Sequence, residues 1–173
     1  MRYKLIIEIE GSAVFAEELG SEAVSGLIGR LPDTSENKEL FGYLAKSASS
    51  EIRSDIACRD NLMEETVEYL SKDSSVDVRR RLSGQTPFRE WASTELLLEY
   101  INADIECAKI IACSVGEYSN ADTNKIAAEL CKHPDPDVRN TLAGNWGTPK
   151  KFLKQLASDS DASVRSSAKQ ALD

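Results

Sequence analysis

The sequence predicts an all-α, right-handed solenoid of short helical pairs, with a short β-strand or extended segment at its N-terminus. Three observations support this fold class. A motif recurs along the chain, its apolar positions follow the period of a helix, and the first ten residues alternate instead with the period of a strand. We expect one domain over residues 1–173, with the strand and a degenerate capping unit in 1–34 and repeat units in 35–173.

The repeat is anchored on an arginine that follows an apolar residue. Copies occur at Arg53, Arg79, Arg139 and Arg165. The interval between the first two anchors equals the interval between the last two. The interval between the second and third anchors is more than twice as long and leaves room for one more unit, "DIECAKIIACS", in which Ala108 replaces the arginine. A further degenerate copy, "SEAVSGLIG", places Val24 at the anchor.

Each unit is expected to form two helices joined by a polar turn. Thr148 and Pro149 are typical of an N-cap and the first position of a first helix. In the second helix we expect Asp135 as the cap, Pro136 at the first position and Asp137 in the first turn, where the helix dipole favours negative charge. Short helices with half-apolar faces are unstable alone, so neighbouring units must stack and share a core.

The units resemble the leucine-rich repeat variant family, a relative of HEAT-like α-solenoids. Its consensus, close to V-R-x-x-[VL]-A-x-N-x-x-T-P-x-x-x-L-x-x-L-A-x-D-x-D, is followed by "VRNTLAGNWGTPKKFLKQLASDSD" at 138–161, and the resemblance covers residues 36–170. The segments "QTPFREWAS" and "VGEYSNAD" are insertions into this pattern. The resemblance implies an interaction scaffold, although a HEAT-like branch includes alkylpurine DNA glycosylases, which bind DNA on a basic concave surface.

The composition bounds the partners and the location. A net charge of −8 argues against general binding to nucleic acid or anionic membranes and fits a protein partner with a basic face. The chain shows no secretory signal and no apolar run long enough to span a bilayer, so we expect a cytoplasmic protein. The four cysteines form no CxxC pair and there is one histidine, so we expect reduced thiols, no metal and no cofactor.

The residues that resemble an active site are interpreted as structural. The repeat position of His133 is occupied by Asp73 and Asp159 in other copies, which indicates a turn residue rather than a general base. Asp135 and Asp137 match helix caps better than metal ligands. The repeated arginines are expected to make bidentate ion pairs with acidic turn residues, for which the candidates are Asp73, Asp77, Asp135 and Asp159. We therefore predict no catalytic residues and no enzymatic activity.

Six residues are candidates for contact with a partner. They are Trp91, Trp146, Phe88, Tyr118, Arg80 and Arg81. Trp146 lies in a connector and Trp91, Phe88 and Tyr118 lie in the insertions, where an aromatic anchor fits a binding hot spot. The alternative for the tryptophans is packing over their own loops. The alternative for Arg80 and Arg81 is a solvated helix face.

The N-terminal segment is the one predicted non-helical element. Tyr3, Leu5, Ile7 and Ile9 alternate with Lys4, Ile6, Glu8 and Glu10. We expect no second strand in the chain, and a lone strand leaves unpaired edges. It pairs with its twin in a homodimer, pairs with a partner's sheet, or packs along the first helices as an extended cap, which is the alternative we favour.

The function predicted from these features is a non-enzymatic protein–protein interaction scaffold that binds through its repeat surface and inserted loops. One alternative is a HEAT-like nucleic-acid-binding or DNA-repair protein, which requires a basic groove from residues such as Arg80, Arg81, Lys109 and Lys150. Another is an acidic inhibitor or immunity-type protein that blocks a basic enzyme.

Overall fold

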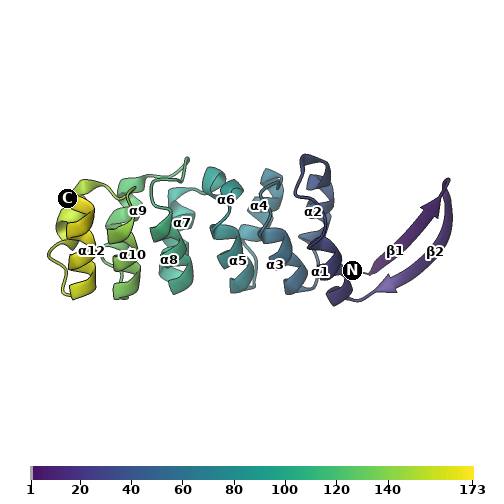
Figure 1. The fold of residues 1–173 in the computed structure, drawn as a ribbon, viewed down its shortest axis with the longest axis horizontal. Coiled ribbons are helices and arrows are strands. Elements are labelled where there is room, and N and C mark those ends of the chain that lie inside the picture. The colour runs from purple at the N-terminus through teal and green to yellow at the C-terminus, as the bar shows by residue number, and fades with distance from the viewer. Residues whose placement is uncertain (1) are drawn as a thin grey trace. The chain divides into compact units, whose positions relative to one another are not determined.

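A computed structural model describes the backbone of residues 2–173 and the side chains of all of these except Ile7 and Ile9. The described chain contains one β-hairpin and twelve α-helices. It forms two compact units, of which the first ends at Leu82 and the second comprises Ser83–Asp173 (Figure 1). Every helix in these residues is too short or too polar to cross a membrane.

The first unit begins with a β-hairpin, not with the lone strand that we predicted. Strand β1, Tyr3–Ile9, pairs antiparallel with β2, Ser12–Leu19. Between them Glu10 and Gly11 have φ angles of 52° and 78°, the left-handed conformation of a two-residue hairpin turn that matches the twist of the strands. The expectation of no second strand, and with it the extended cap, is therefore wrong.

The helices of the first unit form two layers (Figure 1). They are α1 (Ser21–Ile28), α2 (Lys38–Leu44), α3 (Ser50–Ala57), α4 (Glu64–Ser71) and α5 (Val76–Ser83), with a short 3-10 turn at Ser35–Asn37. Helix α2 contacts α4 in one layer, and α1 contacts α3 in the other. The apolar side chains of both layers meet between them.

Helix α1 enters this arrangement one residue out of the predicted register. Val24 and Ile28 are buried, whereas Leu27 is 44% exposed. The buried pair is spaced like Ile52 and Ile56 of α3, so the anchor position of this degenerate copy is Ser25 and not Val24. The hydroxyl of Ser25 donates a hydrogen bond to the Asp55 carboxylate on α3.

The second unit repeats the two-layer packing over a longer segment. Its helices are α6 (Thr86–Trp91), α7 (Thr94–Ala103), α8 (Ile105–Cys113), α9 (Thr123–Leu130), α10 (Pro136–Gly144), α11 (Lys150–Leu156) and α12 (Ala162–Leu172). Helix α7 contacts α9 in one layer, while α10 contacts both α8 and α12 in the other.

The predicted core positions of the repeat are buried. The residues one before the anchor are Ile52, Val78, Cys107, Val138 and Val164, and those three after it are Ile56, Leu82, Ile111, Leu142 and Ala168; all are at most 1% exposed. Burial of these i, i+4 pairs draws one face of each second helix into the core. The prediction of stacked helical pairs is confirmed at this level. The right-handed winding and the assignment of residues 1–173 to one domain stay predictions.

The helix starts agree with the sequence except at α11. Asp135 accepts a hydrogen bond from the Asp137 N–H at 2.7 Å and caps α10, with Pro136 at its first position, as predicted. Helix α11 begins at Lys150 with Pro149 as its N-cap, so the predicted cap at Thr148 is wrong. The buried Thr148 hydroxyl instead donates to the Leu142 carbonyl at 2.6 Å and closes the connector behind α10.

The two insertions pack against each other. The first forms helix α6 instead of a loop, with Pro87 in its first turn. The second, residues 115–122, runs beside the end of α6. The N–H of Ser119 donates to the Arg89 carbonyl at 3.1 Å, and the Asn120 side chain donates to the Glu90 carbonyl at 2.6 Å. The second insertion thus satisfies carbonyls that the end of α6 leaves open.

The register of α1 can be tested with two adjacent substitutions. Ile28→Ala removes a side chain that is 1% exposed, so we expect the free energy of unfolding to fall by about 2–4 kcal/mol. Leu27→Ala, at 44% exposure, is the matched control and should change it by less than about 1 kcal/mol. Urea unfolding followed by circular dichroism measures both. A larger loss for Leu27→Ala would contradict this register.

Candidate functional site

The repeat arginines make the predicted bidentate ion pairs at two places. Arg53 Nε and Nη2 lie 2.6 and 2.9 Å from the two carboxylate oxygens of Asp73. Arg139 makes the same contacts with Asp159 at 2.8 and 2.9 Å. Each aspartate follows its arginine at the same sequence distance and lies in the turn of the next helical pair. The ion pair therefore joins consecutive pairs within a unit.

A second set of contacts ties each arginine to its own turn. Arg53 Nη1 donates to the carbonyls of Ser47 and Ala48 at 2.9 and 3.1 Å, and Arg139 Nη1 does so to those of His133 and Pro134 at 2.8 and 3.1 Å. The guanidinium of Arg53 or Arg139 thus uses four of its five N–H groups inside the repeat. These contacts are those of a structural group that links neighbouring repeats.

The remaining repeat positions follow the same scheme in part. Arg165 Nη1 donates to the carbonyls of Asp159 and Ser160, both at 2.8 Å, and Arg79 Nη1 donates to the Asp73 carbonyl. Asp77, which we considered as a partner for these arginines, lies 3.3 Å from Arg80 on the surface of α5. Asp135, also considered, serves as the cap of α10.

The two aspartates of the ion pairs are ionised more readily than free carboxyl groups. At Asp73 burial acts to raise the pKa, but hydrogen bonds from Arg53 and from the Ser75 N–H outweigh it, and the net pKa is lowered. At Asp159 the hydrogen bond from Arg139 is the main cause of a lowered pKa. The side chains of Asp73 and Asp159 are only 3% and 9% exposed. These pairs are shielded from solvent and screened little by salt.

His133 has the structural role that the repeat predicts. Its Nδ1 accepts a hydrogen bond from the Asp135 N–H at 3.2 Å. The same bond to the N–H two residues ahead is accepted by Ser47 at 3.1 Å, and by Asp73 and Asp159 at 2.8 Å. The histidine is half-buried rather than exposed. Its imidazole closes a turn, as the side chains at this position do in the other copies.

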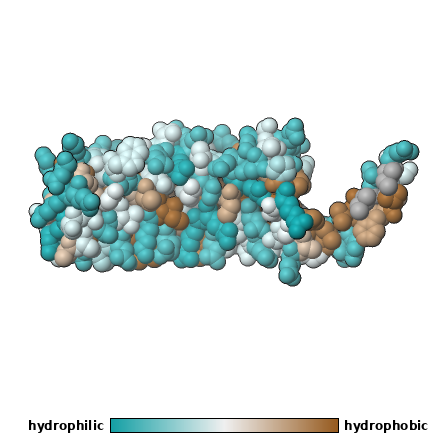
Figure 2. All heavy atoms as spheres, viewed as in Figure 1, coloured by the Kyte–Doolittle hydropathy of each residue, from teal (hydrophilic) through white to brown (hydrophobic). Residues whose placement is uncertain are grey.

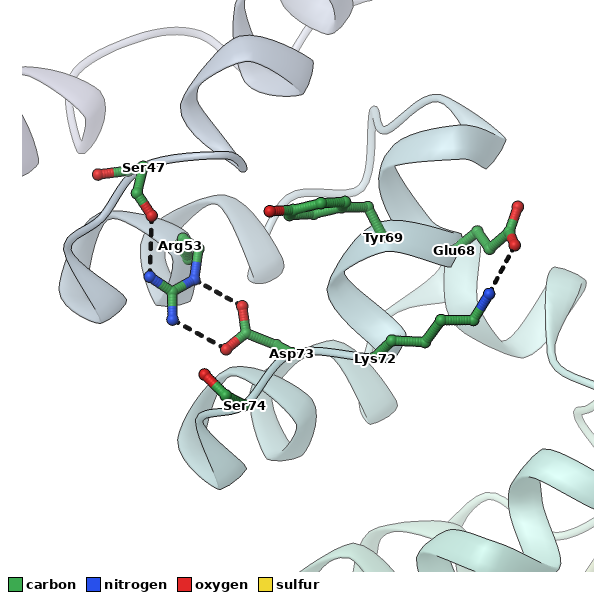
Figure 3. A pocket seen from close by; sticks show the side chains of 7 residues that line it. All are labelled: Ser47, Arg53, Glu68, Tyr69, Lys72, Asp73 and Ser74. Atoms are coloured by element: carbon green, nitrogen blue, oxygen red, sulfur yellow. Dashed lines mark hydrogen bonds and ion pairs between the residues drawn. The ribbon is translucent and has the colours of Figure 1, made fainter. Parts of the chain in front are cut away.

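A pocket of about 570 Å³ lies over the Arg53–Asp73 pair in the first unit (Figure 3). Tyr69 lines one side, and Lys72 bonds to Glu68 at 2.7 Å along the rim. A smaller pocket of about 230 Å³ lies between α2 and α4. Tyr69 lines both pockets, and Tyr43, which is 68% exposed, lines the smaller one. These tyrosines are separated by the same interval as the first two arginine anchors, so they occupy the same repeat position on neighbouring helices.

The connector between α10 and α11 presents Trp146 to solvent. Its side chain is 89% exposed, more than that of any other large apolar residue described. On one side, Asn145 is buried and its amide donates to the Ala112 and Cys113 carbonyls of α8 at 3.0 and 2.5 Å. On the other, Gly147 packs so closely that an added Cβ would lie 2.3 Å from the Val115 carbonyl oxygen. Contacts of Asn145 and Gly147 hold the backbone of the connector in place, while the Trp146 indole lies in solvent and not in the core.

The other predicted contact residues are less accessible. Phe88 is fully buried and stacks on Tyr100 with ring centroids 5.5 Å apart. Trp91 is half-buried, 6.4 Å from Phe88. Tyr118 is 5% exposed, and burial raises its pKa. The structure places Phe88 and Tyr118 in the core of the second unit, which leaves their predicted contact with a partner without support.

Several basic and sulfur-containing residues of the described chain make polar contacts or are buried. Arg80 pairs with Asp77, and Arg81 donates to the Cys58 sulfur at 3.4 Å. Burial raises the pKa of the Cys131 thiol to about 11, so it is protonated at neutral pH. No group of three or more His, Cys, Asp or Glu side chains in residues 2–173 is placed to hold a metal ion.

The ion pair between α10 and the next turn has a testable pH dependence. We expect Asp159→Asn to lower the free energy of unfolding at pH 7 by about 2–3 kcal/mol, because Arg139 loses its charged partner. The pKa of Asp159 is lower in the folded chain, so its stabilisation is complete above about pH 4, the unfolded value, and is lost as the pH falls through the folded pKa.

Urea unfolding at pH 7 and at pH 3 measures this dependence. The difference between the wild type and Asp159→Asn should shrink at pH 3. Asp137→Asn, on the exposed first turn of α10, is the control and should have a small effect at both values. An equal difference at both pH values would contradict the role given to the carboxylate.

The rigidity of the Trp146 connector depends on Gly147. Gly147→Ala drives a Cβ against the backbone of Val115, so we expect the free energy of unfolding to fall by about 1–3 kcal/mol. Gly144→Ala, whose Cβ would meet no atom within 4 Å, is the matched control and should be neutral or stabilising. Thermal unfolding compares the two. Equal melting temperatures would show that the close approach is not a constraint.

No family model matches the chain, and no curated protein matches it. Among solved structures, the chain is similar to one described as a leucine-rich repeat variant with a novel repetitive structural motif, at 17% identity and a TM-score of 0.42. The match covers 87% of this chain and 66% of that one, so the chain spans about two thirds of the length of that structure.

Proposed function

We propose that the chain is a non-enzymatic protein-binding scaffold, built as a right-handed solenoid of HEAT-like or leucine-rich-repeat-variant type. In this proposal Trp146 is the anchor that a partner protein binds. The observation that carries it is the 89% exposure of this indole on a connector whose neighbours, Asn145 and Gly147, are held against the preceding helical pair.

The exposed position of Trp146 has a cost in free energy. A tryptophan is among the largest apolar side chains, and its exposure to water forgoes the free energy that burial would supply. The connector also loses its flexibility through the hydrogen bonds of Asn145 and Thr148. A rigidly held aromatic group loses little conformational entropy when a partner covers it, which is the usual character of a binding hot spot.

The charges of the chain indicate which charges a partner's surface would need. The net charge of −8 supports a partner with a basic face, as predicted from the sequence. Helix α11, directly after the connector, instead carries Lys150, Lys151 and Lys154, all exposed. We therefore propose that the partner offers the indole an apolar pocket with acidic groups toward α11, and that its basic face lies against other parts of the chain.

The two alternatives have less support from the described residues. A nucleic-acid-binding groove needs several free basic side chains. Of the residues considered for it, Lys150 is exposed, whereas Arg80 pairs with Asp77 and Lys109 pairs with Glu106 at 3.1 Å. An inhibitor of a basic enzyme would use the same net charge of −8, but the carboxylates of Asp73 and Asp159 cannot contribute to its contact, because arginines already occupy them. Saturation of these repeat groups also supports a role without catalysis.

Capture experiments with two matched baits test the proposal. The wild-type chain and Trp146→Ala are used to capture proteins from cells that produce the chain. Because hot-spot truncation costs about 2 kcal/mol or more, a partner bound through the connector should bind the variant about 30-fold more weakly or worse. Tyr43→Ala, which removes an exposed aromatic ring from the first unit, is the control and should retain the partner.

Fluorescence of the captured complex supplies the direct readout. In a Trp91→Phe background this chain's own tryptophan emission comes from Trp146 alone, since the chain has two tryptophans, and the emission of the isolated partner is subtracted. Partner binding should shift this emission to shorter wavelength and shield it from iodide. A partner that binds wild type and Trp146→Ala equally, with no change in emission, would contradict the assignment of the anchor.

A further inference from the structure

The β-hairpin is incomplete as a sheet. In the described chain β1 and β2 form a two-stranded sheet, so each strand has one edge without a ladder partner. Apolar side chains along it remain in water, with Ile6, Val14 and Phe15 at 49%, 57% and 46% exposure (Figure 2). An isolated two-stranded hairpin is at best marginally stable, and three or more strands are needed for independent stability.

The two edges of this sheet differ in their ability to pair. Strand β2 contains a bulge, because Phe15 and Ala13 pair with successive residues of β1 and Val14 has no partner. It also carries Glu17 and Glu18 side by side. Bulges and charges of one sign are the devices that protect a sheet edge from pairing. Strand β1 pairs at every position from Tyr3 to Ile9. It has no bulge, and its charged residues, Lys4 and Glu8, are of opposite sign.

The charges of β1 are arranged to complement a second copy of the same strand. Basic residues, Arg2 and Lys4, lie at its start, and acidic residues, Glu8 and Glu10, lie at its end. In an antiparallel pair centred on Ile6, Lys4 of each chain lies opposite Glu8 of the other, and Arg2 lies opposite Glu10. If the pairing were centred on Leu5, Arg2 would still face Glu8, but Lys4 would face Ile6. If it were centred on Ile7, Lys4 would face Glu10, but Glu8 would face Ile6.

The hairpin itself leaves Glu8 available for this contact. Within the sheet Glu8 lies opposite Ala13, an uncharged residue, whereas Lys4 lies opposite Glu18. The Tyr3 hydroxyl donates to the Ser47 hydroxyl at 2.5 Å, which ties the start of β1 to the turn before α3 through a side chain. Neither contact uses the backbone groups of the open β1 edge.

We propose that β1 is a self-association edge, at which a second copy of this chain adds its own β1 antiparallel about Ile6. The product is a symmetric four-stranded sheet in the order β2–β1–β1–β2. It completes the backbone hydrogen bonds of β1 and places Lys4 and Glu8 in two equivalent ion pairs across the two-fold axis. The inference concerns the hairpin and is independent of the Trp146 anchor.

Charge reversal on the full-length chain tests this register. The mass in solution is measured by sedimentation over a range of concentrations for wild type, Lys4→Glu and Glu8→Lys. Each variant sets like charges opposite each other twice in the dimer, so we expect association about tenfold weaker than in the wild type. Glu17→Lys makes the same charge change as Glu8→Lys on β2 and should retain wild-type association.

Mixing the two variants is the decisive arm. In an equimolar mixture of Lys4→Glu and Glu8→Lys, opposite charges again face each other at every position 4 and 8, and the dimer should return as a heterodimer. Local unfolding of a hairpin by either substitution would not be repaired by mixing. A monomeric wild type at all concentrations, failure of the mixture to associate, or equal weakening by Glu17→Lys would each overturn the proposal.

Discussion

The bidentate contact between a repeat arginine and the aspartate of the next turn organises the helical pairs. Its geometry makes each aspartate a node: the Asp73 carboxylate accepts from Arg53, while its backbone carbonyl accepts from Arg79. Asp159 joins Arg139 and Arg165 in the same way. One short turn thereby holds the second helices of two consecutive pairs, α3 and α5 at Asp73 and α10 and α12 at Asp159. The apolar stripes of both helices can then stack with little freedom to slide.

The repeat contacts use most of the hydrogen-bonding groups of these arginines. Groups that would attract a ligand in isolation, such as the Arg53 guanidinium beneath the larger pocket, have nearly all their hydrogen bonds satisfied by the repeat. The Trp146 indole and the N-terminal hairpin take no part in these arginine contacts. Trp146 occupies a variable position of the repeat, in the connector between two helices, and the hairpin precedes the repeat units. The proposed anchor and the proposed self-association edge belong to these two segments.

The periodic features of the structure could be predicted from the sequence. Features that depend on contacts between residues distant in the chain could not. The regular spacing of the anchors located the Arg53–Asp73 contact, because a second copy of the motif repeats it. Helix α1 offers two apolar stripes offset by one residue, Ala23 with Leu27 and Val24 with Ile28, and only packing against α3 selects the second. Strand β2 was missed because Ala16 and two adjacent glutamates break its alternation, although the Glu10–Gly11 turn was a usable signal. Trp146 was identified, but its exposure required the structure.

The mutual packing of the two insertions has a consequence for how such a chain can change length. The carbonyls at the end of α6 accept hydrogen bonds from Ser119 and Asn120. The buried ring of Phe88 lies on the same short helix. Removal of the second insertion alone would leave the Arg89 and Glu90 carbonyls without these hydrogen bonds, and removal of the first would leave the Ser119 N–H without its acceptor. The stability cost of deleting one insertion therefore depends on whether the other is present. The two insertions form one structural unit that is divided between two neighbouring repeats.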